Sequence, residues 1–167
     1  IFGSEFEWFN FKESAETLRE KNFQNLTPLT PGMFGYSILR SSLENEYFNA
    51  LIDLLRDFNI PLEGIHTETG PGVYEAAIAC SGALEAADGA VLFKTAVKEI
   101  ANKYGITATF MARWNKGLPG CSGHLHQSLE KDGKNIFYDK NHSHKMSVTL
   151  QHFIAGQLHC MPYILPL

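Results

Sequence analysis

Five residues whose side chains commonly bind metal ions lie on three separate segments of the chain: Glu5 and Glu7, Glu68 and Glu75, and His124. Four carboxylates and one imidazole suit a hard divalent cation such as Mg²⁺ or Mn²⁺ better than a structural zinc. Sites of this composition usually hold the phosphates of a nucleotide. The sequence therefore predicts an enzyme that uses ATP together with a divalent cation.

The first pair of acids lies in an alternating segment, Ser-Glu-Phe-Glu-Trp. Side chains alternate between the two faces of a strand, so Glu5 and Glu7 point to one face, and Phe6 and Trp8 to the other. An ordinary edge strand with a solvated acidic face shows the same pattern. The spacing alone therefore leaves a metal site and a solvated face as alternatives.

The second pair of acids flanks a Gly-Pro-Gly tripeptide. This tripeptide must turn the chain, so two extended arms can bring Glu68 and Glu75 back to one place. A hairpin loop with two exposed acids is the alternative interpretation.

The third segment places His124, His126 and Ser128 at alternating positions, so all three share one strand face. A lone histidine is usually a satisfied core residue, whereas two at i and i+2 with a hydroxyl at i+4 favour ligation or phosphate contact. Zinc with Cys121 as a third ligand is the rival metal. The chain has three cysteines and no C-x-x-C pair, which disfavours zinc.

Composition bounds the class of protein. The 167 residues are 44% hydrophobic and 19% charged, values typical of a globular domain. A net charge of −4 without a basic cluster argues against a nucleic-acid partner. The apolar runs are too short to cross a membrane. An odd number of cysteines without framework spacing suits a reducing compartment, so we expect a cytoplasmic protein.

Alternating strands and helices are predicted to position these residues. Ser41 or Ser42 can cap the first long helix, and Gly105 suits the end of the second. The patterns predict strands at 5–10, 64–68, 73–79, 107–113 and 122–130, a short helical turn at 14–19, a loop at 25–35, a hairpin turn at 132–135, and helices at 43–58, 84–104 and 143–160.

Several motifs in series resemble the glutamine synthetase family, its type I-like and lengsin-like branch. They are Gly-Pro-Gly-Val-Tyr-Glu-Ala-Ala-Ile, Ala-Leu-Glu-Ala-Ala-Asp-Gly-Ala-Val-Leu-Phe-Lys, Gly-Ile-Thr-Ala-Thr-Phe-Met-Ala-Arg-Trp and Ser-Gly-His-Leu-His-Gln-Ser-Leu. They occur in the order usual for the catalytic core of that family. A series of motifs over roughly a hundred residues is far more specific than one short motif.

The resemblance implies a role for each metal-binding candidate. Glu7, Glu68 and Glu75 fall where the family binds the metal that organises the amino-acid and amine side of the reaction. Glu5 and His124 fall where the family binds a second metal, which bridges the nucleotide phosphates. Family members transfer a phosphoryl group from ATP to the γ-carboxylate of glutamate, and an amine then attacks the acyl phosphate.

The resemblance also implies contacts with substrates. Glu63, His126 and Ser128 fall at positions that contact ATP, and Gly120 falls in the loop that contacts glutamate. Glu68 is expected to be catalytic as well as a metal ligand. The implied partners are thus ATP, glutamate and an amine, with Mg²⁺ or Mn²⁺.

Two departures from the family pattern lie near the amino-acid substrate. Where the family usually has Gln-x-Glu, this chain has Val73-Tyr74-Glu75, and where it usually has Asn-Gly, this chain has Pro119-Gly120. These changes resemble relatives that ligate glutamate to other amines, and also lengsin, which is regarded as lacking synthetase activity. A non-catalytic structural or assembly protein therefore remains the alternative to a glutamate–ammonia or glutamate–amine ligase.

We predict one α+β unit, in which a curved, mostly antiparallel sheet carries all five metal ligands on its concave face with long helices behind it. The family begins with a β-grasp domain that has no counterpart in this chain. Residues 1–167 are therefore expected to be a partial glutamine synthetase catalytic domain, without the N-terminal β-grasp domain and the C-terminal part, and inactive alone. The full-length protein is expected to form stacked, dodecamer-like rings.

Overall fold

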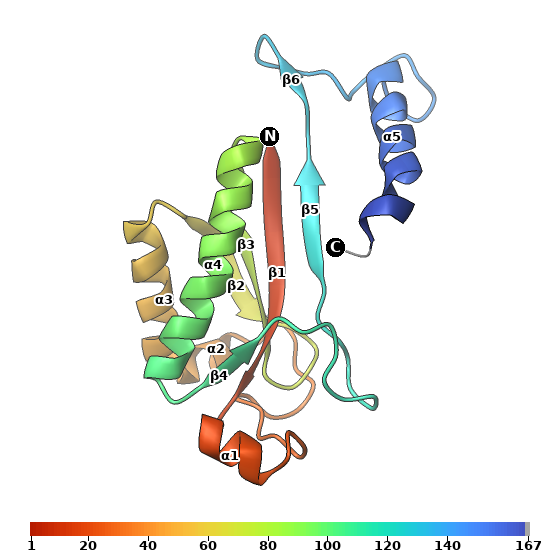
Figure 1. The fold of residues 1–167 in the computed structure, drawn as a ribbon. Helices are drawn as coiled ribbons and strands as arrows, with labels where there is room; N and C mark the ends of the chain where they lie inside the picture. The colour runs from red at the N-terminus through yellow and green to blue at the C-terminus, as the bar shows by residue number, and fades with distance from the viewer. Residues whose placement is uncertain (166–167) are drawn as a thin grey trace. The chain divides into compact units, whose positions relative to one another are not determined.

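The computed structural model describes residues 1–165, which divide into two units where the sequence patterns predict one. The sheet unit comprises residues 2–126, and the helix unit comprises Ile1 with residues 127–165. Figure 1 shows the elements of both units along the chain. All but one of the candidate site residues fall within the sheet unit, so this unit is described first.

A five-stranded sheet forms the sheet unit, with the order β2-β3-β1-β4 and with β5 also pairing to β1. The pairs β1–β3, β1–β4 and β2–β3 are antiparallel, so the predicted α+β fold with a mostly antiparallel sheet is confirmed. The strands are β1 (Phe2–Phe11), β2 (Leu62–Thr67), β3 (Val73–Ile78), β4 (Thr107–Thr109) and β5 (Gly123–Gln127).

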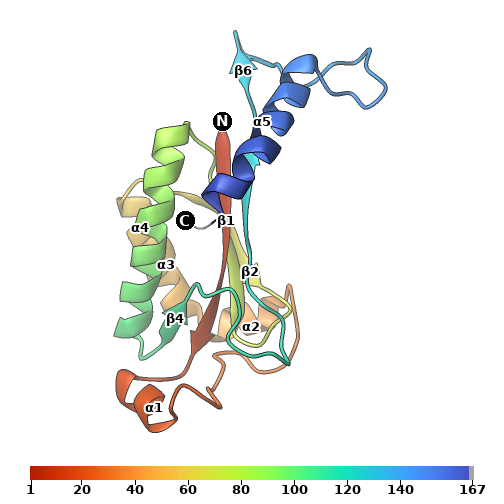
Figure 2. The same ribbon diagram turned by 45° about the vertical axis from the view of Figure 1, so that its right-hand side comes forward.

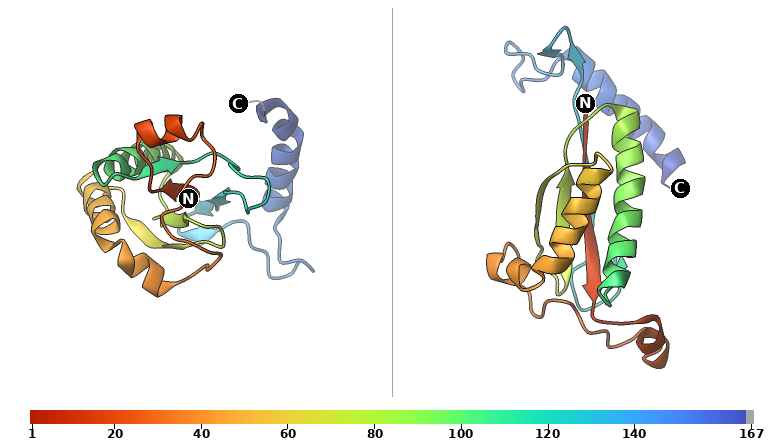
Figure 3. Two further views of the ribbon diagram at one scale, coloured as in Figure 1. Left: turned by 90° about the horizontal axis from the view of Figure 1, so that it is seen from below. Right: turned by 90° about the vertical axis from the view of Figure 1, so that its left-hand side faces the viewer.

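Two long helices, α3 (Asn45–Asp57) and α4 (Ala83–Lys103), cover one face of this sheet. They lie side by side in front of the strands in the right-hand view of Figure 3. Trp8 of β1 and Phe93 of α4 are fully buried between the layers, with ring centroids 5.7 Å apart. The opposite face of the central strands is free of these helices, and it carries the candidate site.

Of the two short helices, the first agrees with the predicted helical turn at 14–19, and the second was not expected. Helix α1 (Ala15–Glu20) follows a capping box at Ser14 and lies beyond the carboxyl end of β1 (Figure 2). Helix α2 (Ile38–Leu43), capped by Ser37, was not predicted. Because Ser41 and Ser42 lie inside α2, their hydroxyls donate to carbonyls of the preceding turn, and neither caps α3.

The helix unit contains a hairpin and a helix. Strands β6 (Glu130–Lys131) and β7 (Lys134–Asn135) are joined through Asp132 and Gly133, whose φ values of 53° and 70° are typical of a type I′ turn. Helix α5 (Val148–Ile164) begins after Ser147, later than predicted, because the Ser147 hydroxyl accepts from the Leu150 amide. Among the described residues, no helix is both long enough and apolar enough to span a membrane.

Candidate metal centre

The register of β1 and β3 places three of the predicted ligands on the face of the sheet opposite α3 and α4. Glu7 lies opposite Glu75, and Trp8 lies opposite Tyr74. Trp8 and Tyr74 are fully buried in the core beneath the helices. Because side chains alternate along each strand, Glu5, Glu7 and Glu75 point away from that core.

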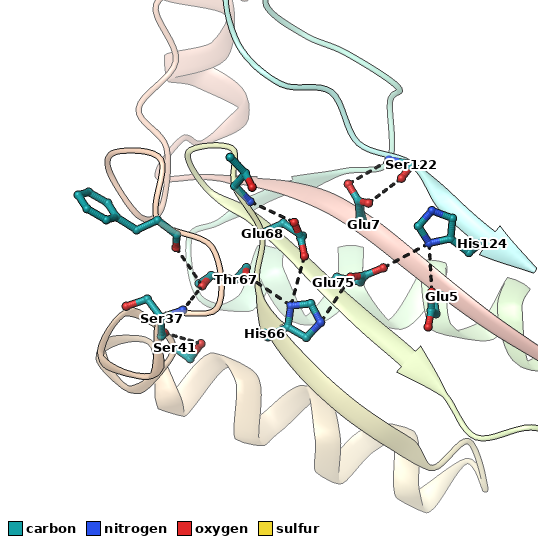
Figure 4. Close-up of polar contacts among 12 residues, drawn as sticks. Glu5, Glu7, Ser37, Ser41, His66, Thr67, Glu68, Glu75, Ser122 and His124 are labelled. Atoms are coloured by element: carbon teal, nitrogen blue, oxygen red, sulfur yellow. Dashed lines mark hydrogen bonds and ion pairs between the residues drawn. The ribbon is translucent and has the colours of Figure 1, made fainter.

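Strand β5 brings its histidines to the same face beside β1. His124 Nδ1 lies 3.0 Å from Glu5 Oε2 and 3.6 Å from Glu75 Oε1. His126 Nε2 lies 3.2 Å from the same Glu5 oxygen. Glu5, Glu75 and His124 each offer a ligand atom within 4.8 Å of the other two, and Figure 4 shows their side chains converging.

The turn between β2 and β3 supplies a second group around Glu75. His66 Nε2 lies 3.4 Å from Glu75 Oε2, and His66 Nδ1 lies 3.6 Å from Glu68 Oε1. These three residues also offer ligand atoms within 4.8 Å of one another, so Glu75 belongs to both groups. The sequence reasoning missed His66. The available signal was its position two residues before Glu68, which places both side chains on one side of an extended segment.

Glu7 lies on the same face but is not a member of either group. Its carboxylate accepts hydrogen bonds from the Ser122 hydroxyl at 2.6 Å and from the Ser122 amide at 3.1 Å. Glu7 therefore fixes the start of β5 against β1 in this structure (Figure 4).

The three remaining candidates lie outside these groups. Glu63 is exposed, at an irregularity of β2 between Leu62 and Gly64. Gly120 begins the approach to β5, where an added Cβ would lie 2.6 Å from the Ala112 carbonyl oxygen, so only glycine fits. Ser128 belongs to the helix unit, where its amide donates to the carbonyl of Ile1.

The carboxylates of the site differ in their electrostatics. Burial raises the pKa of Glu75, the His66 ring opposes that rise, and the negative charges of Glu68, Glu7 and Glu5 add to it. The pKa of Glu5 is lowered, chiefly by the hydrogen bond from His126 and further by His124. The pKa shifts of Glu75 and Glu5 are thus opposite in direction, and Glu75 lies at the point where the two groups meet.

Two neighbouring side chains bear on the chemistry of the site. The Tyr36 ring lies 4.8 Å from the His66 ring, and the Glu68 carboxylate raises the pKa of the Tyr36 hydroxyl through a hydrogen bond. Burial raises the pKa of Cys121 to about 12, assisted by the charges of Glu7 and Glu68. Cys121 belongs to neither of the two groups of ligand atoms found among the described residues, so this geometry does not support the zinc alternative.

Residues 1–167 match the family model described as the glutamine synthetase catalytic domain. The chain belongs to the glutamine synthetase family. It is 55% identical to Type-1 glutamine synthetase 2 of Dictyostelium discoideum over 168 residues, which cover 99% of this chain and 32% of that protein.

Other members of the glutamine synthetase family extend the comparison. The chain is 34% identical to glutamate–isopropylamine ligase of Pseudomonas sp over 155 residues, 92% of this chain and 34% of that protein. It spans about a third of the length of these curated relatives. The cryo-EM structure of Plasmodium falciparum glutamine synthetase has the same fold, with a TM-score of 0.77 and 22% identity over 95% of this chain and 35% of that one.

The two residues that depart from the glutamine synthetase pattern, Val73 and Pro119, both make packing contacts near the site. Val73 is buried against Phe9 and Phe11 on the side of the sheet that bears the site. Its side chain therefore adds apolar packing where a glutamine would offer hydrogen bonds. Pro119 approaches the Gly-Pro-Gly turn near Gly70, and it packs the loop that contains Gly120 against that turn.

Proposed function

We propose that this chain supplies part of the catalytic domain of an ATP-dependent ligase, which joins glutamate to ammonia or another amine through γ-glutamyl phosphate with two divalent cations. The observation that carries the proposal is the shared position of Glu75. One strand residue offers its carboxylate to two sets of ligand atoms, one with Glu5 and His124 and one with His66 and Glu68. Two adjoining sets suit a reaction that needs a cation at the nucleotide and another at the acceptor.

The donor chemistry fits Mg²⁺ or Mn²⁺. The donors are carboxylate oxygens and imidazole nitrogens, which suit these cations. In the described part of the chain, the ion-pair partners of Glu5, Glu68 and Glu75 are histidines, with no lysine or arginine among them. An external cation would supply the positive charge that the protein itself does not place there.

We assign one cation to Glu7, Glu68 and Glu75 and the second to Glu5 and His124. When bound, the cations would neutralise charge on the transferring phosphoryl group. To bind the first cation, Glu7, which lies opposite Glu75, would share its oxygens between the metal and Ser122.

The chain's own residues would bind and orient the substrates. His126, Glu63 and Ser128 would contact ATP, and the Gly120 loop would contact glutamate. Glu68 would act catalytically by orienting the amine and accepting its proton, from a carboxylate that the Thr69 amide holds at 3.2 Å. The full-length protein would act in the cytoplasm as stacked, dodecamer-like rings.

A non-catalytic assembly protein is the second candidate, and buried Val73 favours it because this residue offers a substrate no hydrogen bond. Phosphate release from the full-length protein, dependent on both ATP and an amine, separates the two functions. A series of ammonia, ethanolamine, a polyamine and an aromatic amine would define the acceptor. Absence of release with every amine would favour the assembly protein.

Titration calorimetry with Mn²⁺ tests the metal site directly. We expect Glu75→Gln to weaken Mn²⁺ binding by more than about 10-fold, since loss of even an outer partner of a metal ligand has that effect. The fold should remain intact, and relief of repulsion should stabilise the cation-free chain by less than about 1 kcal/mol. Glu99→Gln, an exposed acid on α4, is the matched control and should bind like wild type. Equal affinity in wild type and Glu75→Gln would remove Glu75 from the site.

A further inference from the structure

Asn10 is a fully buried polar residue, and both polar atoms of its side chain have hydrogen-bond partners. Its Oδ1 accepts from Trp8 Nε1 at 2.9 Å and from the Tyr47 hydroxyl at 3.0 Å. Its Nδ2 donates to the carbonyl oxygen of Gly72 at 3.3 Å. A buried amide costs free energy unless it is satisfied, so such a residue in a strand needs a reason beyond packing.

The bond to Gly72 joins Asn10 to the Gly-Pro-Gly turn. The backbone N–H of Asn10 also donates to the Gly72 carbonyl, at 2.8 Å. This carbonyl therefore accepts two hydrogen bonds from Asn10, one from the backbone and one from the side chain. Gly72 has a φ of +71°, and an added Cβ would lie against the Asn10 carbonyl oxygen. The backbone at this point therefore requires glycine and lies directly on β1.

The same turn joins the two segments that carry Glu68 and Glu75, the carboxylates on either side of His66. The Glu68 amide donates to the Val73 carbonyl at 2.9 Å, which closes the turn, and Glu75 follows two residues after Val73. The Gly72 amide donates to the Thr30 carbonyl at 2.9 Å and fixes the other side of the turn. The turn is thus held from the buried interior, on the opposite side of the sheet from the metal ligands.

We propose that Asn10 is a positioning residue, which sets the separation of Glu68 and Glu75 through its bonds to Gly72 and so tunes divalent-cation affinity. The inference rests on the proposed metal site. The two ends of the Asn10 amide have separable tasks: Oδ1 serves the core through Trp8 and Tyr47, and Nδ2 serves the turn. A variant of Tyr47 can therefore weaken the first task while the bond to the turn is kept.

The test compares Tyr47→Phe with the double variant Asn10→Leu/Tyr47→Phe in the full chain. Tyr47→Phe removes one bond to Oδ1 and keeps the bond to Gly72. The double variant removes the side-chain bond to Gly72 together with the acceptor of Trp8 Nε1, whereas the backbone N–H of residue 10 still donates to Gly72 and no tyrosine hydroxyl is left unpaired. Mn²⁺ affinity by titration calorimetry, the thermal midpoint, and amide hydrogen exchange at Gly72 and Val73 are measured for both. Asn10→Thr, which nearly fills the site but cannot reach Gly72, replaces the double variant if that chain does not fold.

We expect Tyr47→Phe to lower the thermal midpoint with unchanged Mn²⁺ affinity. The double variant should bind Mn²⁺ about 10-fold more weakly, the loss typical of removing an outer partner of metal ligands, with faster exchange at Gly72 and Val73. A purely structural role predicts that affinity follows the thermal midpoint in both variants, and equal affinity in both would overturn the proposal. If wild type binds no Mn²⁺, the proposed metal site fails, and unchanged exchange at the turn would then reject the positioning role independently.

Discussion

Glu13 and Glu75 are acidic residues in two regions of the same sheet unit, and the protein treats them in opposite ways. Glu13, just beyond β1, is 3% exposed, and its carboxylate pairs with Lys21. It also accepts from the Thr17 hydroxyl and the Thr27 amide, each at 2.7 Å. Lys21 and these hydrogen bonds lower the pKa of Glu13 from its ordinary 4.5 to about 2.

Glu75 has no comparable partner. Its side chain is 13% exposed, its ion-pair partners are His66 and His124, and burial raises its pKa. The difference shows that this fold can supply a cation to a buried carboxylate where it needs one for stability. At Glu75 the ion-pair partners are histidines, which is the arrangement that the proposed metal site requires.

Substitution of Glu13 should produce the largest loss of stability among these variants. We expect Glu13→Gln to reduce the free energy of unfolding by about 2–3 kcal/mol, since charged hydrogen bonds are lost and Lys21 keeps its charge. Urea unfolding at neutral pH measures the loss. Glu16→Gln on α1 is the control, because Glu16 is exposed and bonds to Ser14, and it should change stability by less than about 0.5 kcal/mol. An unfolding free energy equal to wild type would show that Glu13 contributes no more than a surface acid.

Glu13 and Glu75 should also differ in how their contributions to stability depend on pH. Since the folded pKa of Glu13 is depressed, its contribution is present above pH 4.5 and is lost as pH falls toward about 2. Glu75 has a raised pKa in the folded state, so its effect on the pH dependence of stability is opposite to that of Glu13. The stability that protonated Glu75 contributes is present at low pH and is lost as pH rises through its folded pKa. Urea midpoints from pH 2 to 6 should therefore converge for wild type and Glu13→Gln at the acid end. A constant difference across that range would contradict the lowered pKa.

The sequence predicted regular elements better than it predicted their ends. Period-two and 3.6-residue patterns identified β1, β3, α3 and α4 because each has one face against the core. Helix α2 was not predicted because none of its six residues is buried, so no amphipathic pattern marks it. The predicted strand at 107–113 ends at Thr109 because the Arg113 guanidinium instead binds the carbonyls of the following loop.

The site was predictable only in part, for a related reason. Alternation indicated that Glu5 and Glu7 share a strand face, and the Gly-Pro-Gly turn indicated that Glu68 and Glu75 return to one place. The structure groups Glu75 with Glu68 and also with Glu5 and His124, and the sequence patterns did not indicate this second grouping. His66 and Asn10 depend on which strands are neighbours and in what register, and a single sequence contains no pairing information of that kind. The hydrogen bonds between Glu7 and Ser122 likewise join residues 115 positions apart.

His126→Ala should have the smallest effect on stability and should sharpen the contrast between the two regions. The His126 side chain is 68% exposed, so its removal should change the unfolding free energy by less than about 0.5 kcal/mol. Its hydrogen bond is the leading cause of the lowered pKa of Glu5, so that pKa should rise, while His124 still holds the carboxylate at 3.0 Å. With fewer hydrogen bonds to lower its pKa, Glu5 would then resemble Glu75 more than Glu13. Carbon-detected NMR titration of the Glu5 carboxyl measures the change, with His142→Ala in the helix unit as the control. If the proposed nucleotide contact holds, ATP affinity falls in His126→Ala alone, whereas an unchanged Glu5 titration would mean that His126 does not hold this carboxylate in solution.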